Sequence, residues 1–250
     1  MYQFRSLKSL YSVAILYRLP DYTEQKYTCS IVVNARRVKE NYLFILEERS
    51  GIQLNGEKPQ KVVDNLMAQL GNCLYPIELY VNANGELLSV PNFEQIKEIW
   101  FKTATELLKQ NKTQAFRNYL EAAKENLSDE KSFLKSLNKD SFIHLFFKDY
   151  ASNSVELSFA NFPYQNRKSD FHVRKIPSVR NTYTLFPAFK EAKVQDTGGK
   201  MICLKNDPSG EPLRIVVNIY LSTSKSDFYH KKILIEADDN AHEVKTGLFF

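Results

Sequence analysis

The 250-residue chain has few of the residues that build metal centres and disulfide frameworks. It contains three cysteines and four histidines, and no pair of histidines has the spacing of a zinc motif. Cys29, Cys73 and Cys203 are odd in number and far apart, which favours free thiols. We therefore expect no metal site, no disulfide and no cofactor.

Long apolar segments are also absent. Arg5, Lys8 and Arg18 interrupt the first twenty residues, so these lack the apolar stretch of a secretory signal. No run approaches the ~18 apolar residues of a membrane helix. We expect a cytoplasmic protein that does not insert into a membrane. A signal segment removed upstream of this sequence would invalidate the cytoplasmic prediction.

Charge is neither strong nor clustered. The net charge is +5 and the pI is about 8.9, and lysines and arginines are scattered among acidic residues. A dedicated nucleic-acid binder has a concentrated basic surface, so nucleic acid is not an expected partner. Hydrophobic residues make up 43% of the chain, which is enough for a sizeable core and excludes a disordered chain.

Hydrophobic periodicity predicts strands at both ends of the chain. Apolar residues alternate with polar ones in Tyr11–Tyr17, Tyr27–Val33, Val155–Phe159 and Leu213–Leu221. The middle has helical spacing instead. We predict an α+β fold in which an antiparallel sheet from the N- and C-terminal strands packs on a central group of helices. The prediction is one domain over residues 1–250, with strands in 1–50 and 154–250.

Between the two groups of strands, we expect a helix and hairpin over 60–91 and a helical segment over 92–150. Gly71 follows the predicted helix 60–70 as its C-terminal cap, and Asn84-Gly85 is a hairpin turn signal. Asn92, Ser128 and Asp140 are expected N-caps. The predicted apolar face of the first long helix includes Ile96, Ile99 and Trp100, and the last helix, Phe142–Phe147, is expected to be buried. The expected long loops are 164–180 and 193–199.

The stretch from Leu79 to Trp100, a hairpin followed by a helix, resembles a segment of uncharacterised Bacteroidota-type α+β proteins. The resemblance covers under a tenth of the chain. It implies a bacterial origin and a curved sheet over helices, and it transfers no catalytic residues.

One combination of residues resembles a metal-dependent nuclease of the PD-(D/E)xK family. Asp170 lies about twenty residues before Glu191 and Lys193, and such enzymes hold a divalent cation with an Asp and a Glu beside a Lys. The residue before Asp170 is Ser169 rather than proline, which departs from the family pattern. No catalytic residue is assigned on this basis.

Two segments place apolar or aromatic residues where an isolated domain would gain little stability from them. In the predicted 164–180 loop, aromatic and basic side chains suit a protein interface, and the chain ends on an apolar tail. The candidate partner-binding residues are Tyr164, Arg167, Phe171, Arg174, Leu248, Phe249 and Phe250.

These observations favour a non-catalytic, bacterial, intracellular protein-binding module, such as an adaptor, chaperone, immunity protein or structural component of an assembly. Its expected partner is another protein. The alternative is a carrier that encloses an apolar ligand between a curved sheet and helices, and the third possibility is the metal-dependent nuclease. A large apolar cavity would favour the carrier, whereas a filled core would favour the protein-binding module.

Overall fold

The structure is a computed structural model that describes residues 7–21, 23–148, 155–160, 162, 168–176, 181–188, 196–205, 212–222 and 227–238. Its main element is an eleven-stranded sheet in which neighbouring strands are antiparallel. The strands are β1 (Leu7–Arg18), β2 (Glu24–Val38), β3 (Asn41–Leu54), β4 (Ile77–Val81), β5 (Leu87–Ser89), β6 (Val155–Ala160), β7 (Lys168–Lys175), β8 (Thr182–Pro187), β9 (Asp196–Lys205), β10 (Pro212–Ser222) and β11 (Phe228–Ala237).

The strand order is β5-β4-β3-β2-β1-β11-β10-β9-β8-β7-β6. The N-terminal strands and the C-terminal strands therefore form one sheet, as the sequence predicts, and they join where β1 pairs with β11. The predicted hairpin around Asn84-Gly85 is also confirmed, because β4 pairs with β5 across it. Gly85 has a φ of 82°, which a glycine adopts without steric cost.

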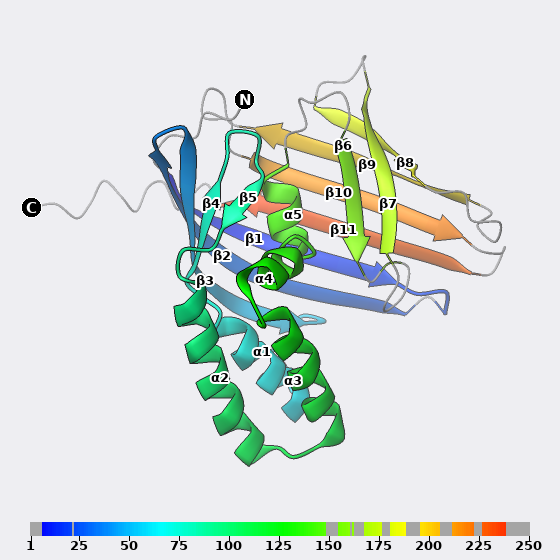
Figure 1. The fold of residues 1–250 in the computed structure, drawn as a ribbon. Helices are drawn as coiled ribbons and strands as arrows, with labels where there is room; N and C mark the ends of the chain where they lie inside the picture. Colours follow the sequence, from blue (N-terminus) through cyan, green and yellow to red (C-terminus); the bar gives the residue numbers. More distant parts are fainter. Residues whose placement is uncertain are drawn as a thin grey trace, which may run out of the picture.

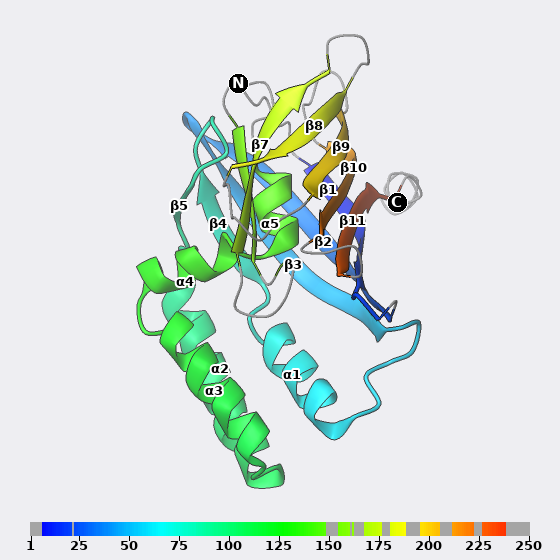
Figure 2. The ribbon, with the colours of Figure 1, turned by 90° about the vertical axis from the view of Figure 1, so that its right-hand side faces the viewer.

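The structure describes five helices: α1 (Val62–Asn72), α2 (Phe93–Gln110), α3 (Gln114–Asn126), α4 (Glu130–Leu137) and α5 (Ser141–Phe146). The prediction that the sheet packs on a central group of helices is only partly right. In Figures 1 and 2 the sheet curves around α5, while α1, α2 and α3 lie together at one end of the molecule. The fold is dominated by its sheet because only one short helix occupies the concave face.

Alternating apolar residues line the concave face in continuous rows. Cys203, Ile215, Ile235, Val13 and Cys29 are directly opposite one another on five neighbouring strands. Each of them is at most 5% exposed. Since side chains on a strand alternate between its two faces, this row accounts for the period-two pattern of the sequence.

Aromatic side chains pack α5 into the curve of the sheet. The ring of Phe146 meets that of Tyr11 edge to face, with centroids 5.1 Å apart, and Phe147 meets Phe44 at 4.7 Å. The Asp140 carboxylate caps the helix by accepting hydrogen bonds from the backbone N–H groups of Phe142 and Ile143. The predicted cap and the predicted burial of this helix are both confirmed.

Other predicted helix ends differ from the structure. Asp129 rather than Ser128 caps α4, because its carboxylate accepts from the Ser132 N–H. The Asn92 side chain does not cap α2; it bonds instead to the backbone of Glu78 and Pro76. Gly71 lies inside α1 rather than after it. At Asn92, a contact with a neighbouring segment replaces the local cap that the sequence suggests.

Two segments predicted as loops are strands. Residues 168–175 form β7, and 196–199 are the first residues of β9, which continues to Lys205 and includes both glycines of Gly198-Gly199. A Cβ added at Gly199 would lie 2.6 Å from the Asn218 carbonyl oxygen, so this glycine permits close backbone approach rather than a turn. In the described part of the chain, no helix is both long and apolar enough to cross a membrane.

Trp100 on α2 tests the predicted helical core. It is 3% exposed, whereas Ile99, which the sequence also placed on the apolar face, is 40% exposed. We expect Trp100→Ala to lower the free energy of unfolding by about 3–5 kcal/mol, because it leaves a cavity. Ile99→Ala, the matched control, should cost less than about 1 kcal/mol. Urea melts measure both, and equal effects would contradict the burial of Trp100.

Candidate functional site

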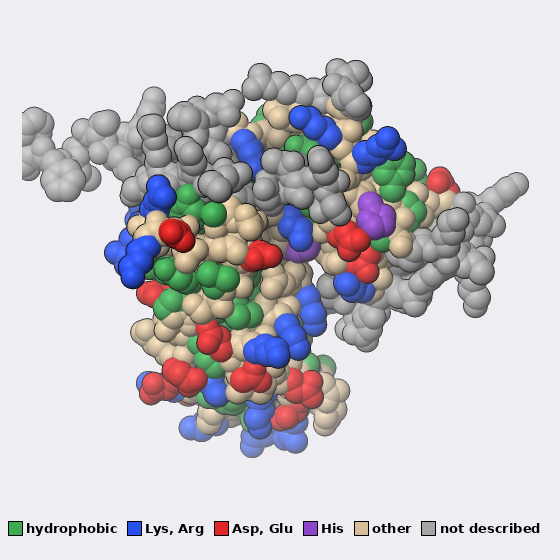
Figure 3. Space-filling view, turned by 45° about the horizontal axis from the view of Figure 1, so that its top comes forward, with side chains coloured by type: hydrophobic (Ala, Val, Ile, Leu, Met, Phe, Trp, Pro, Cys, Tyr) green, Lys and Arg blue, Asp and Glu red, His purple; other side chains and the backbone are tan. Residues whose placement is uncertain are grey.

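The two end strands of the sheet, β5 and β6, lie on opposite sides of α5. A groove of about 760 Å³ separates them, with the β4–β5 hairpin forming one wall and the start of β6 the other. The last turn of α5 forms its floor. Figure 3 shows a hollow on this face with histidine and lysine or arginine side chains at its rim. The sheet is thus curved so that its two end strands lie on either side of the groove.

The groove has a mixed lining. Leu88, Ile143 and Phe147 supply apolar side chains from the hairpin and from α5, and Val155 supplies another from β6. Leu88 is 45% exposed, so much of its apolar side chain is accessible at the groove. Polar groups come from both walls and from the floor, where His144 lies. The groove therefore offers both apolar contacts and hydrogen-bonding groups to a ligand.

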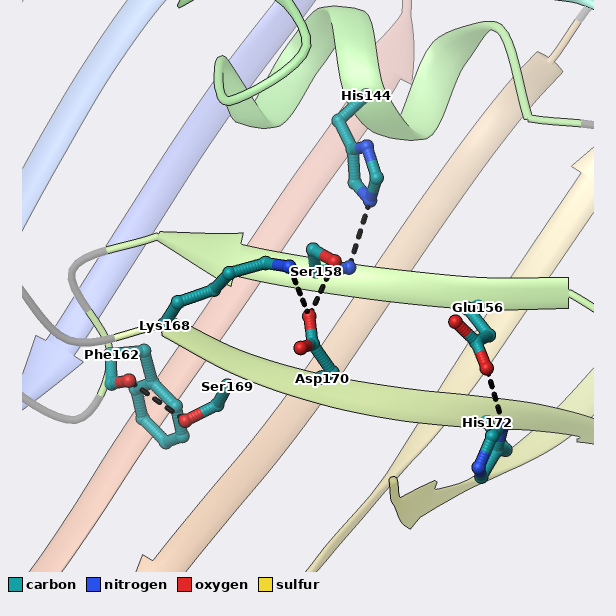
Figure 4. A network of polar contacts seen from close by, with 8 residues as sticks. All are labelled: His144, Glu156, Ser158, Phe162, Lys168, Ser169, Asp170 and His172. Atoms are coloured by element: carbon teal, nitrogen blue, oxygen red, sulfur yellow. Dashed lines mark hydrogen bonds and ion pairs between the residues drawn. The ribbon is translucent and has the colours of Figure 1, made fainter. Parts of the chain in front are cut away.

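His144 connects the floor of the groove to β6, the last strand of the sheet among the described residues. Its Nε2 accepts a hydrogen bond of 3.1 Å from the Ser158 N–H (Figure 4). The ring nitrogen that accepts cannot carry a proton, so the proton of the neutral imidazole is on Nδ1. Burial, followed by the charges of Lys148, Lys168 and Lys231, lowers the pKa of His144 to about 4. The ring is therefore neutral at physiological pH.

The hydrogen bond between Ser158 and His144 also shows which backbone groups of β6 point away from its neighbouring strand β7. Alternate residues of an antiparallel strand point their N–H and C=O groups to the same side. Because the Ser158 N–H points away from β7, the backbone groups of Glu156 point away as well, toward the groove that Glu156 lines. At the other end of the sheet, Glu130 of α4 accepts from the Val90 N–H at 2.6 Å, just beyond β5.

A polar network lies across β6 and β7 on the outer face (Figure 4). The Ser158 hydroxyl donates to Asp170 Oδ1 at 2.5 Å, and Lys168 Nζ lies 3.0 Å from the same oxygen. Burial raises the pKa of Asp170, but the hydrogen bonds from Ser158 and Lys168 outweigh it, and the net pKa is lowered. The serine hydroxyl thus donates to a carboxylate and not to His144, so these residues do not form a nucleophile–base pair.

The structure places Phe171 and Arg174 differently from the predicted partner-binding loop. Both belong to β7, and Phe171 is fully buried against Phe159, with ring centroids 5.9 Å apart. Its assignment as a contact residue is wrong, since the alternation of Ser169, Phe171 and Val173 turns these side chains toward the core. Arg174 is exposed. Outside the described residues are Tyr164, Arg167, Leu248, Phe249 and Phe250.

The nuclease-like combination is not assembled in the described residues. Asp170 is paired with Lys168, while Glu191 and Lys193 lie outside the part that the structure describes. Among the described residues, no three His, Cys, Asp or Glu side chains are grouped so that they could hold a metal ion.

Sequence reasoning missed a buried cation. Lys231 of β11 is 2% exposed and takes a position on the concave face opposite Tyr17 of β1. Its Nζ lies 4.9 Å from the centre of the Tyr17 ring and 5.6 Å from that of Phe159. Burial lowers the pKa of Lys231 to about 8, although the charge of Asp140 opposes this. The alternation of His230, Lys231, Lys232 and Ile233 contained the only signal, since Lys231 shares the face of Ile233.

His144 makes stability depend on acid pH. Its pKa is about 4 when folded and 6.5 when unfolded, so below pH 6.5 the unfolded chain binds the proton more strongly. Its contribution should be intact above pH 6.5 and should fall by about 2 kcal/mol as the pH drops toward 4. His144→Gln should remove this part of the pH dependence, whereas His172→Gln, at an exposed site, should not. Urea melts above pH 6.5 and near pH 4 measure this loss of stability. Identical pH profiles of wild type and His144→Gln would refute the assignment of the loss to His144.

Lys231 makes stability depend on alkaline pH in the same sense. The pKa of about 8 lies below the ordinary 10.5, so between these values the unfolded chain binds more protons. The free energy of unfolding should rise by about 2 kcal/mol between pH 8 and 10. This rise should be lost in Lys231→Met and kept in Lys232→Met, which changes the exposed neighbour. Guanidinium melts across this range decide, and a rise that persists in Lys231→Met would contradict the burial of the amine.

Comparison with known proteins does not assign this geometry to a family. No family model matches the chain, and no curated protein has significant similarity to it.

Proposed function

We propose that this protein is a non-catalytic protein-binding module that holds an extended segment of a partner protein in the groove between β5 and β6. The observation that carries this proposal is the seam of the sheet. Two end strands lie on either side of a groove of about 760 Å³, and β6 directs backbone groups of Glu156 toward it. An extended segment can add to such an edge through main-chain hydrogen bonds.

The lining suits a strand-like ligand. Successive side chains of an extended segment point in opposite directions, so some would contact the apolar floor at Ile143 and Phe147 while others face solvent. The Nδ1–H of His144 supplies a donor for a carbonyl of the partner, because its Nε2 is already engaged with β6. Adaptors, chaperones, immunity proteins and assembly components all remain compatible roles for such a module.

The alternatives have less support. A carrier of an apolar ligand needs an open interior, but α5 fills the concave face with Phe142, Phe146 and Phe147. A nuclease needs carboxylates that are available for a cation, but the Asp170 carboxylate is engaged by Ser158 and Lys168. The filled interior is the outcome that favours protein binding.

The proposal predicts a backbone-dependent peptide site. Peptides selected from a random displayed library on the full chain should bind with micromolar affinity. Glu156→Pro removes the outward N–H of an edge strand, where proline is tolerated, and Leu88→Asp adds a charge to the opposite wall. Each change should weaken binding about tenfold or more, and so should N-methylation of alternate peptide residues.

Ile99→Asp is the matched control, since Ile99 is exposed on α2 and does not line the groove. It should leave the affinity unchanged. Fluorescence anisotropy measures each affinity, and circular dichroism confirms that each variant is folded. A selection that yields no binding peptide, or peptides that bind Glu156→Pro and Leu88→Asp as tightly as wild type, would overturn the proposal.

A further inference from the structure

Arg49 is, with Lys231, a cation on the largely apolar concave face, and a register shift places it there. In the pairing of β2 with β3, Val33 is opposite Leu46, and regular antiparallel pairing would continue with Glu48 opposite Ile31. A β-bulge opposite Val32 and Val33 adds one residue to β3, so that Arg49 rather than Glu48 is opposite Ile31. The bulge thus exchanges a glutamate for an arginine on the buried side of β3.

Helix α1 has a glycine where the guanidinium group lies. A Cβ built at Gly71 would be 2.0 Å from Arg49 Nη2 and 3.2 Å from Cζ, so no other residue could stand there without displacing the arginine. Glycine inside a helix is unfavourable relative to alanine, which makes this position costly unless the space is used. The absence of a side chain at Gly71 leaves room for the Arg49 guanidinium group beside α1.

Among the described residues, one side chain accepts a hydrogen bond from the Arg49 guanidinium group. Its Nε donates to Asn72 Oδ1 at 3.3 Å, and Cζ lies 5.5 Å from the centre of the Tyr75 ring. Among the described residues, no carboxylate lies within 4 Å of it. Asp140 acts on it only through longer-range charge, since that carboxylate caps α5. Arginine has five N–H donors in a planar fork, and Asn72 occupies one side of it.

Three tyrosines from different parts of the chain interact with the charge of Arg49, and the ring of Tyr75 lies next to its guanidinium group. Tyr27 is on β2, Tyr75 follows α1, and Tyr119 is on α3; all three are half-buried, packed against the core, and interact electrostatically with Arg49. Burial raises the pKa of each phenol and outweighs the opposing charge of Arg49. The hydroxyls therefore stay protonated and can donate hydrogen bonds, while the rings provide apolar surface.

We propose that Arg49, with Tyr27, Tyr75 and Tyr119, binds the carboxylate or phosphate group of a small molecule that also has an apolar part. A guanidinium fork matches both of these anions, and phenol hydroxyls add neutral donors around it. The site is independent of the groove between β5 and β6, because it uses β3, α1 and α3 rather than the end strands. The protein would thus carry a small-anion site in addition to its proposed peptide site.

The test uses the full chain and three probes in calorimetric titrations: sodium octanoate, inorganic phosphate and octanol. We expect saturable one-site binding of octanoate or phosphate with a Kd below about 1 mM, and none of octanol. The stronger anion identifies the ligand class. Arg49→Gln should lower the affinity for that anion at least tenfold. Tyr75→Phe should lower it about threefold, which is on the order of the contribution of one hydrogen bond. Arg117→Gln, an exposed arginine on the helix that holds Tyr119, should bind as wild type does.

Gly71→Ala provides a second variant that leaves every charge and donor in place. Its new methyl group would displace the guanidinium, so binding should fall at least tenfold although the helix gains a better helix former. If Arg49→Gln fails to fold, this variant and Tyr75→Phe decide. The proposal is overturned if neither anion binds with a Kd below about 1 mM, or if the anion that binds does so with unchanged affinity in Gly71→Ala.

Discussion

The aromatic packing of α5 against the concave face of the sheet positions the other elements of this protein. Phe146 and Phe147 meet Tyr11 of β1 and Phe44 of β3, so that the helix contacts the middle of the sheet. Burial of several phenylalanine rings stabilises the fold through both area and edge-to-face geometry. Without this helix, the curved sheet would enclose an apolar space that water could not favourably fill.

The position of α5 also determines how the sheet ends. Helix α5 lies between β5 and β6 and keeps the two strands apart. The helical segment also hydrogen-bonds to the backbone at both ends of the sheet, through Glu130 just beyond β5 and through His144 at β6. Natural sheets commonly protect their free edges against unwanted pairing. Here the protection is incomplete, because Glu156 still directs its backbone toward the groove. The proposed site for an extended partner depends on this partial closure.

The two ends of α5 face different chemistry. The C-terminal end lies at the groove, while the N-terminal cap, Asp140, extends its charge toward both Arg49 and Lys231 on the concave face. These two cations are placed on an apolar surface without a close carboxylate among the described residues. One is stabilised by the rings of Tyr17 and Phe159, and the other lies against Gly71 and Tyr75. Their burial carries a cost that a purely structural face would avoid.

What the sequence determined by itself is local. Alternation in Tyr11–Tyr17 is enough to predict a strand and its buried face, and Asp140 and Asn84-Gly85 mark a helix start and a turn through contacts within a few residues. Such signals depend only on neighbours along the chain, so no knowledge of the fold is needed to read them. They predict strands at both ends of the chain, but not which of those strands pair.

Only the tertiary structure decided which residues meet across long separations. The bulge that turns Arg49 inward depends on pairing between two strands, and the role of Gly71 depends on that arginine lying beside α1. The groove exists because β5 and β6, distant in sequence, are the two ends of one curved sheet. Phe171 was misassigned for the same reason, since a short alternating run becomes a strand only when a partner strand pairs with it. Register and closure are set by packing between distant segments, which no local pattern specifies.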